Sequence, residues 1–397
     1  MTVVGYINMA DGLGRQSVEL IKTFQEDHII NFYRTRKKRQ RGYNDVDPKV
    51  IPILKKQYKE AGKIILVEDY ECFHPYKLQK ILGKTKNREE HILLAYTMFE
   101  SSKAPREWIE VLNKFFDAII VPDPYQVMVF QSSGANIPVF SLPLGLYLEE
   151  YLKLPLKKEK RRPFTFASFS SLDPRKNHMA LIRAFSKAFG NTAEVQLRLH
   201  FRYEGRGMRE SLQQEIGRLG LFNVTITSGP LPQKDYIQAF QSIDCYMNLS
   251  KGEGFSIQPR EAMALGIPVI VSDNTSQHTI AESQLVKAVP AKIKEPAYYP
   301  HIKQFCGSFY LFHIDEAADA MRDVYLHYEK YLAKGQEARN WAAQYDFAQL
   351  KKYYQNLIKP KQILFGDKNE ITEEYLMTSS FPLFEKYRKL TSANSLN

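Results

Sequence analysis

The hydrophobic pattern of the chain predicts parallel strands that alternate with helices. Apolar runs of roughly four to eight residues recur without the strict polar alternation that marks a strand exposed on one face. Such runs fit strands that are buried on both faces of a parallel sheet. They lie at residues 3–7, 64–67, 92–96, 118–121, 139–142, 164–168, 195–201, 224–228, 245–249 and 268–271. Apolar residues at helical spacing between the later runs predict helices over residues 180–189, 208–219 and 236–243.

The alternation of strand and helix occurs twice over, which predicts two α/β domains. A length of 397 residues also suits two domains, or three at most. A charged stretch bracketed by prolines at 154–163 interrupts both periodicities and predicts an exposed linker. We therefore expect an N-terminal domain over 1–153 and a C-terminal domain over 164–345. Residues 346–397 would form a C-terminal helix and a tail, and a return of this segment to the first domain is left open.

Composition and charge narrow the class of protein. Hydrophobic residues make up 44% of the chain and charged residues 25%, which is the balance of a globular protein with a core. The 55 Lys and Arg against 44 Asp and Glu leave a net charge of +11, which suggests an anionic partner. Three cysteines without a CxxC spacing predict neither a disulfide framework nor a zinc site. Without a secretion signal or a long apolar run, we expect a cytoplasmic protein, with peripheral membrane attachment left open.

The stretch from Ser250 to Ser272 carries the clearest chemistry. A strand ends before it, a Gly-rich loop follows, and Pro259 suits the first turn of a helix. Ligands of open α/β sheets gather at such strand-to-helix loops, where backbone N–H groups favour a phosphate or a sugar oxygen. Glu253 lies in the loop and Glu261 in the first helical turn, so the two carboxylates could reach one ligand. Alternatively, Glu261 only complements the helix dipole and Glu253 is a solvated loop charge.

This stretch resembles the Glu-Gly-Phe-Gly…Glu-Ala-Met-Ala-x-Gly-x-Pro-Val signature of the retaining glycosyltransferases of family 4. These enzymes have the GT-B fold, an α/β architecture of two Rossmann-like domains whose parallel sheets face across a cleft. The resemblance implies that Glu261 binds the ribose of a nucleotide-sugar and that Glu253 holds the donor sugar with the loop that follows. That loop contains Gly254, Phe255, Ser256 and Ile257. Ser256 stands where the family commonly has glycine.

The strand that follows the linker leads into a basic turn. Arg175 and Lys176 in this turn could neutralise a diphosphate, Lys as a point charge and Arg as a fork, or they could be two exposed loop cations. The turn looks like the diphosphate-binding loop of the family. Family members often carry an arginine four or five residues before the lysine, whereas Ser170 lies in that region here. We count Ser170 among the donor-binding candidates and expect Arg175 or Arg202 to replace the missing arginine.

Three candidates lie in the first domain. Glu100 follows a buried strand and could contact the acceptor hydroxyl or help move its proton, or it could be an ordinary capping or ion-paired group. Gly12 and Gly14 follow the first strand, but Ser17 stands where the pattern G-x-G-x-x-G requires glycine. They form either a tight turn or, as in the N-terminal Gly-rich loop of the family, a close approach of backbone to the cleft and the donor.

Two basic runs, at 34–41 and 157–162, are either solvated loops or contacts for an anionic membrane or a phosphate-bearing acceptor. No aromatic residues are interleaved with these runs, so nucleic acid is not expected as a partner.

The resemblance implies a retaining hexosyltransferase of glycan biosynthesis that needs neither metal nor another cofactor. It would move a sugar from a nucleotide-sugar to a hydroxyl of a glycan, a lipid-linked or a protein-linked acceptor. One alternative is a metal-dependent transferase of the GT-A type, because Asp45 and Asp47 could hold a divalent cation against a diphosphate. The other alternative is a nucleotide-sugar-binding module without turnover.

Overall fold

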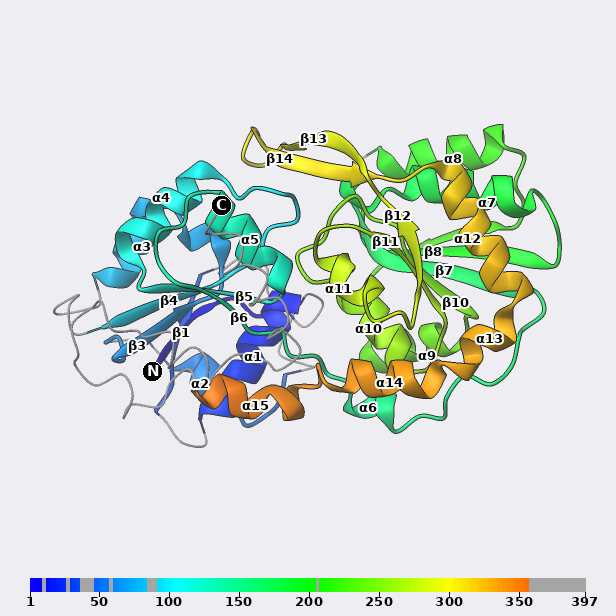
Figure 1. Cartoon of the computed structure of the whole chain (residues 1–397). Coiled ribbons are helices and arrows are strands. Elements are labelled where there is room, and N and C mark those ends of the chain that lie inside the picture. Colours follow the sequence, from blue (N-terminus) through cyan, green and yellow to red (C-terminus); the bar gives the residue numbers. More distant parts are fainter. Residues whose placement is uncertain are drawn as a thin grey trace. The chain divides into compact units, whose positions relative to one another are not determined.

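The computed structural model describes residues 1–8, 12–25, 29–35, 46–56, 60–83, 91–204 and 207–356. The chain divides into two compact units (Figure 1). The first unit contains residues 1–99 and 103–145 together with the helix that begins at Phe347. The second unit contains residues 100–102 and 146–346.

The first unit is built around a parallel sheet in the strand order β2-β1-β3-β4-β5-β6. Most of its strands are short and apolar, so they are covered on both faces. In Figure 1, α3 and α4 lie on one face of this sheet and α1 and α15 on the other. The strands are β1 (Thr2–Gly5), β2 (Asn31–Arg34), β3 (Ile64–Val67), β4 (Ile92–Tyr96), β5 (Ala118–Val121) and β6 (Val139–Ser141). The helices are α1 (Gly12–Phe24), α2 (Ile51–Lys55), α3 (Pro75–Leu82), α4 (Arg106–Phe115), α5 (Pro124–Ser132) and α15 (Phe347–Asn356).

The second unit has its own parallel sheet, in the order β12-β11-β10-β7-β8-β9, and an antiparallel hairpin of β13 and β14. Its core lies between β7, β8, β10 and the helices α7 and α12, where Phe166, Phe185 and Met321 are fully buried. The strands are β7 (Phe164–Leu172), β8 (Val195–Glu204), β9 (Val224–Ser228), β10 (Cys245–Asn248), β11 (Val269–Asp273), β12 (Lys287–Pro290), β13 (Ile293–Tyr299) and β14 (Gln304–Leu311). The helices are α6 (Glu149–Leu152), α7 (His178–Phe189), α8 (Met208–Arg218), α9 (Gln233–Gln241), α10 (Ile257–Ala264), α11 (His278–Ala281), α12 (Ile314–Leu326), α13 (Tyr328–Ala333) and α14 (Gly335–Ala343).

Apart from residues 100–102, the chain changes unit at positions 145/146 and 346/347, which differs from the expected boundaries. Residues 154–163, expected as a linker, belong to the second unit, where Lys157 Nζ lies 2.9 Å from a carboxylate oxygen of the buried Asp244. The helix expected within residues 346–397 begins at Phe347, directly after Asp346, whose carboxylate accepts a hydrogen bond from the Leu148 backbone N–H. Residues 359–397 lie outside the described residues.

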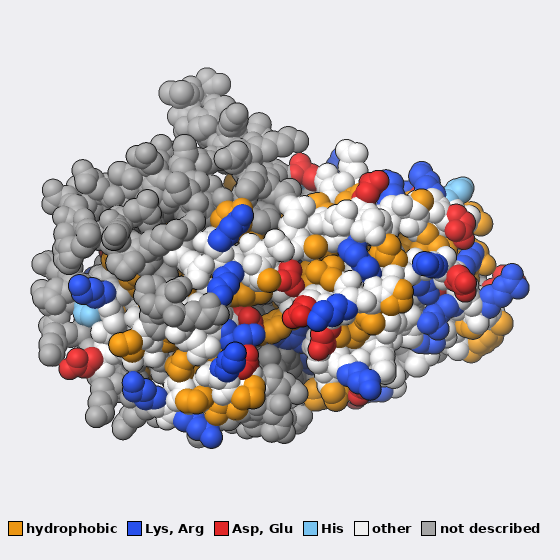
Figure 2. Space-filling model, turned by 90° about the horizontal axis from the view of Figure 1, so that it is seen from below, with side chains coloured by type: hydrophobic (Ala, Val, Ile, Leu, Met, Phe, Trp, Pro, Cys, Tyr) orange, Lys and Arg blue, Asp and Glu red, His pale blue; other side chains and the backbone are white. Residues whose placement is uncertain are grey.

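Within the described ranges, no helix is both long and apolar enough to cross a membrane. Seen from below, Figure 2 shows Lys and Arg side chains spread over the described surface of the second unit, with Asp and Glu side chains between them. Cys72, Cys245 and Cys306 are buried free thiols.

Candidate functional site

The candidate residues of the second unit gather at the carboxyl ends of β7, β10 and β11. These strands are neighbours in one parallel sheet, so the loops that leave them share one edge. Arg175 and Lys176 form a short 3₁₀ turn after β7, and Glu253 lies in the loop after β10. A second 3₁₀ turn, Thr275–Gln277, follows β11.

Both cations of the β7 turn bind the carboxylate of Glu253. Arg175 Nη1 lies 2.9 Å from Glu253 Oε2, and Lys176 Nζ lies 2.5 Å from Oε1. The side chains of Arg175, Lys176 and Glu253 are only 15%, 11% and 6% exposed, so solvent screens these ion pairs little. The alternative of two exposed loop cations is therefore wrong, because the β7 turn folds against the loop after β10.

Burial and neighbouring charges shift the pKa of all three groups. Burial raises the pKa of Glu253, but the charges of Lys176 and Arg175 outweigh this and lower it to about 2. Burial and the neighbouring Arg175 charge lower the pKa of Lys176, which Glu253 only partly offsets. Burial alone would lower the pKa of Arg175, but Glu253 and Glu100 raise it. The cluster thus holds two cations, Arg175 and Lys176, and two carboxylates, Glu253 and Glu100.

Glu261 lies in α10, is 3% exposed and accepts a hydrogen bond of 3.0 Å from the hydroxyl of Tyr236. The pKa of the buried Tyr246 on β10 is raised by burial first, and then by the charges of Tyr236, Glu253 and Glu261. Both carboxylates therefore act electrostatically on the same phenol. The interpretation of Glu253 as a solvated loop charge is wrong, because its side chain is buried and doubly ion-paired.

The loop between β10 and α10 is held in an unusual conformation. Ser256 has φ +71°, in the left-handed region that favours glycine, which agrees with its place in the signature. The Asn248 side chain fixes it by donating a hydrogen bond of 2.8 Å to Ser256 Oγ. The side chain of Phe255 is buried against Arg260, with the guanidinium 4.0 Å from the ring centre. Only the backbone of Phe255 can therefore face a ligand; Gly254 and Ile257 flank Phe255 and Ser256 in the same loop and at the start of α10.

Arg260 is a residue that the sequence did not single out. It is fully buried, and its Nη1 donates to the carbonyl oxygens of Phe255 and Ser256. Its guanidinium also lies 4.4 Å from the ring centre of Tyr345 and 5.5 Å from that of Trp341. Cation–π contacts of this kind stabilise a desolvated guanidinium by about 2 kcal/mol. Arg260 thus supports the loop that contains Glu253.

Ser170 lies on β7 and makes a hydrogen bond of 2.9 Å with Nε2 of His178. Burial, together with the nearby Lys176 charge, lowers the pKa of His178 to about 3, so the imidazole is neutral. Of the two arginines considered as replacements for the missing one, Arg175 reaches Glu253, whereas Arg202 lies on β8.

Glu100 counts with the second unit, and its Oε1 lies 3.5 Å from Arg175 Nη2. This contact favours the ion-paired interpretation of Glu100. In the first unit, α1 begins at Gly12, and a Cβ on Gly14 would lie 2.5 Å from the backbone nitrogen of Asn8. Gly14 therefore permits a close backbone approach after β1. A role of Gly12 and Gly14 toward a donor stays a prediction.

Asp45 lies outside the described residues. Asp47 accepts a hydrogen bond of 2.9 Å from the Lys49 backbone N–H and lies 3.4 Å from Lys22 Nζ. Among the residues that the structure describes, no group of three or more His, Cys, Asp or Glu side chains could hold a metal ion. Independence from metal is not tested by this observation and stays a prediction.

Several polar residues of the site were missed by the sequence reasoning. Thr275 Oγ1 accepts from the Glu253 backbone N–H at 2.8 Å, and Gln277 Nε2 donates to Ser250 Oγ at 3.0 Å. Both follow directly after β11, so the argument from strand ends could have found them. Tyr236 lies within α9 and not directly after a strand, so the sequence gives no comparable reason to select it.

The comparisons with known proteins agree with this geometry. Residues 154–289 match the family model of the glycosyl transferases group 1. This match lies within the second unit. The matched segment contains Arg175, Lys176, Glu253 and Glu261.

Solved structures show that the fold extends beyond this segment. Sucrose-phosphate synthase from Thermosynechococcus elongatus has a TM-score of 0.67, with 13% identity over 91% of this chain and 99% of its own. Anabaena Alr3699/HepE in complex with UDP-glucose has a TM-score of 0.65, with 14% identity over 90% and 99% of the two chains. A relative from Sulfolobus islandicus rod-shaped virus 1, named uncharacterized protein 356, is 23% identical over 274 residues, 66% of this chain and 74% of its own. The predicted α/β fold of the GT-B type is confirmed.

Proposed function

We propose that this protein is a retaining glycosyltransferase that moves a hexose from a UDP-sugar to an acceptor hydroxyl without a metal ion. The observation that carries the proposal is the buried cluster of Arg175, Lys176 and Glu253 beside Glu261, within the segment that matches the glycosyl transferases group 1. UDP is the nucleotide in the complex of the similar Anabaena protein, and this supports UDP over other nucleotides. The acceptor would be a glycan, a lipid-linked or a protein-linked hydroxyl.

In this proposal, Arg175 and Lys176 stabilise the diphosphate as it leaves. The bond between the sugar C1 and the diphosphate oxygen breaks, a bond forms from C1 to the acceptor oxygen, and the acceptor proton passes to the leaving diphosphate or to solvent. Negative charge then grows on the diphosphate, and preorganised cations in a buried site are most effective there. Both cations are buried and are held in place by the Glu253 carboxylate, which supports this role.

Glu261 would bind the ribose hydroxyls, with Tyr236 fixing the orientation of its carboxylate. Glu253 would orient the donor sugar and hold both cations in place. A carboxylate with a pKa of about 2 that is already bound by two cations is a weak base and a poor nucleophile. We therefore assign no covalent intermediate to Glu253. Backbone N–H groups of Ser256 and Ile257 at the start of α10 are suited to sugar or phosphate oxygens.

Hydrolysis and transfer assays with a panel of UDP-hexoses test the proposal. Release of UDP in excess EDTA, with retained anomeric configuration by NMR, is the expected result. Product without EDTA but not with it would indicate metal dependence. Nucleotide binding without any product would indicate a module that lacks turnover.

Two variants separate the roles of the site residues. Lys176→Ala removes transition-state stabilisation, so kcat should fall by about 10²–10³-fold. Glu261→Ala removes ribose binding, so the donor KM should rise by about tenfold or more with a smaller effect on kcat. Lys292→Ala, an exposed lysine of the second unit, is the control and should leave both constants unchanged. Unchanged kinetics in the first two variants would remove the site assignment.

A further inference from the structure

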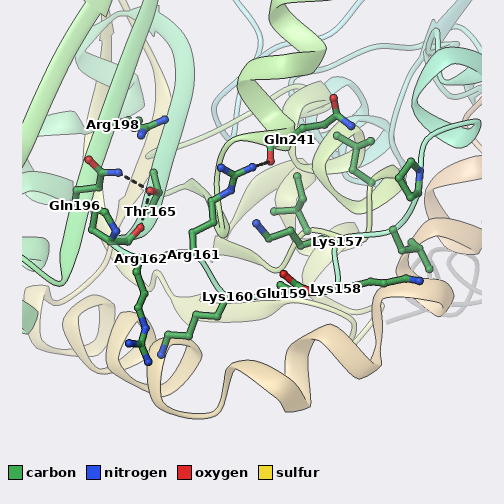
Figure 3. Close-up of a pocket in the computed structure, with 15 residues that line it drawn as sticks. Lys157, Lys158, Glu159, Lys160, Arg161, Arg162, Thr165, Gln196, Arg198 and Gln241 are labelled. Carbon is green, nitrogen blue, oxygen red and sulfur yellow. Dashed lines mark hydrogen bonds between the residues drawn. The ribbon is translucent and has the colours of Figure 1, made fainter.

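A second charged site lies at the amino ends of the strands of the sheet in the second unit, whereas Arg175, Lys176 and Glu253 lie at the carboxyl ends. A pocket of about 870 Å³ opens at the amino ends of β7 and β8, and its lining runs from Pro155 to Pro163. We call residues 155–163 the strap. Thr165, Gln196, Arg198 and Gln241 complete the polar lining (Figure 3). The volume lies within the range of about 300–1,000 Å³ that is common for small-molecule sites.

The strap is a fixed wall of this pocket. The fully buried carboxylate of Asp244 accepts hydrogen bonds from the backbone N–H groups of Arg161 at 3.0 Å and Thr165 at 2.8 Å. Its Oδ1 also lies 2.9 Å from Lys157 Nζ. The backbone N–H of Lys157 donates to the Leu265 carbonyl at 3.0 Å. These contacts tie the strap to the fold at several points, so the pocket does not depend on a free loop.

The lining of the pocket is strongly basic. It holds six cationic side chains, Lys157, Lys158, Lys160, Arg161, Arg162 and Arg198, against one carboxylate, Glu159. Asp244 pairs with Lys157, and its charge also acts to raise the pKa of Lys160. Within the described part of the chain, neither Lys158 nor Arg162 forms an ion pair. Burial and the charge of Arg162 lower the pKa of Lys160, and Figure 3 shows the ends of these two side chains side by side. Cations that repel one another in this way favour an anionic ligand.

We propose that this pocket binds a ligand with two or more adjacent phosphate groups. Arginine forks and lysine point charges are the side chains that bind phosphate best, and six of them line this pocket. Leu156, Leu265 and Ile267 add an apolar part to the lining, which suits a non-phosphate portion of the ligand. The phosphates could belong to a soluble molecule or to a lipid headgroup.

The pocket is distinct from the donor site. Thr165 is the second residue of β7, whereas Arg175 lies in the turn beyond the other end of this nine-residue strand. A strand of that length spans about 27–30 Å, so one ligand cannot occupy both places. The basic run at 157–162, left open between a solvated loop and an anion contact, takes the second role in this proposal.

Calorimetric titration with inorganic tripolyphosphate tests the proposal, first alone and then with saturating UDP to occupy the donor site. We expect wild-type protein to bind one tripolyphosphate that UDP does not displace. The double variant Lys158→Ser with Arg162→Ser should weaken this binding by at least tenfold. The control is Lys292→Ser with Lys294→Ser, which removes two exposed cations of the same unit and should leave the affinity unchanged.

Equal weakening in the two double variants would mean that only overall charge matters, and it would overturn the proposal. Absence of binding, or displacement of all tripolyphosphate by UDP, would overturn it as well. If UDP does not bind, the tripolyphosphate affinities of the two double variants, measured without UDP, still test the proposal. Cosedimentation with phosphatidylcholine vesicles that contain 20% phosphatidic acid identifies the source of the phosphates. Sedimentation that is lost in the pocket variant assigns a lipid headgroup, and no sedimentation assigns a soluble ligand.

Discussion

At the scale of single residues, buried charges are placed where each has a defined partner. Glu253 compensates Arg175 and Lys176, and removal of one partner leaves the other charges buried. Uncompensated buried charge destabilises proteins much more than the loss of an exposed pair does. Glu68 in the first unit is a different case, because it is fully buried and receives a hydrogen bond from Ser17.

Substitution of Glu253 by glutamine should lower the free energy of unfolding by about 3–5 kcal/mol at pH 7. The amide keeps the size of the side chain but removes the counter-charge of the buried Lys176 and leaves Arg175 with only the longer contact to Glu100. Urea unfolding measures the change. Glu295→Gln is the matched control. The side chain of Glu295 is 39% exposed and that of its partner Lys251 is 20% exposed, so the loss of this ion pair should lower the free energy of unfolding by about 1 kcal/mol or less. Similar effects of the two substitutions would contradict the account of the cluster.

The pH dependence of stability should reveal Glu68. Burial raises its pKa to about 8, with a further contribution from Asp69, whereas the hydrogen bond from Ser17 acts in the opposite direction. The folded protein therefore holds a proton that the unfolded chain loses near pH 4.5. The stabilisation from this proton is complete below that pH and is lost as the pH rises toward 8. The free energy of unfolding should fall by on the order of 3–5 kcal/mol over this range.

Glu68→Gln removes this titration and keeps the shape of the side chain. The difference in unfolding free energy between wild type and variant should change steadily between pH 4.5 and 8, in favour of the variant at the higher pH. A difference that is independent of pH would show that Glu68 is ionised in the folded protein.

At the scale of elements, the central strands were the part that the sequence predicted best. The bounds of β3, β4 and β5 coincide with the predicted runs, because buried parallel strands are continuous apolar segments. The bounds of the edge strand β9 coincide as well, although most of its side chains are partly or fully exposed. Strand β7 continues to Leu172, four residues beyond the predicted end, because its polar outer part still pairs with β8. Strands β2, β12, β13 and β14 were missed, since most of their side chains are partly or fully exposed.

The residues of the candidate site were likewise predicted only in part from the sequence. The signature between Ser250 and Ser272 led to Glu253 and Glu261, and the resemblance of the β7 turn to the diphosphate-binding loop of the family led to Arg175 and Lys176. Tyr236 and Arg260 could not be found in this way. Each acts through contacts that only the tertiary structure brings together, with α10 for Tyr236 and with α14 and Tyr345 for Arg260.

Arg260 offers a test of how α10 and its loop are supported. Arg260→Met keeps an unbranched chain but removes the donors to Phe255 and Ser256 and the cation–π contacts. We expect a loss of about 2–4 kcal/mol in the free energy of unfolding, since two carbonyl oxygens lose their buried donor. The donor KM should rise as well. Arg322→Met, at a partly exposed arginine of α12, is the control and should change neither quantity by more than a small amount.

At the scale of the whole molecule, the path of the chain assigns its C-terminal helix to the first unit. Helix α15 packs against α1, and Phe347 occupies the space beside Gly145 that a side chain there would need. The hydroxyl of Tyr354 donates to the Pro143 carbonyl at 2.5 Å and accepts from Gln16 Nε2 at 2.6 Å. The sequence left this return open, because a single amphipathic helix does not indicate which sheet it covers.

Tyr354→Phe removes this hydroxyl and keeps the ring. We expect a loss of about 1–3 kcal/mol in stability, because the Pro143 carbonyl and the Gln16 amide are left in a buried place without this partner. Hydrogen exchange should accelerate in α1 and α15 and remain unchanged in α10 and α14. Faster exchange in both units would contradict the placement of α15 with the first unit alone.

The central claim is that one nucleotide-sugar binds where the β7 turn, the loop after β10 and α10 meet. Equilibrium titration of UDP-glucose into wild-type protein, Glu261→Gln and Lys176→Met tests it most directly, because binding is measured apart from turnover. The account predicts a single site in the wild type and affinities at least tenfold weaker in both variants, with the Lys292→Ala control unchanged. Equal affinity in all four proteins would contradict it.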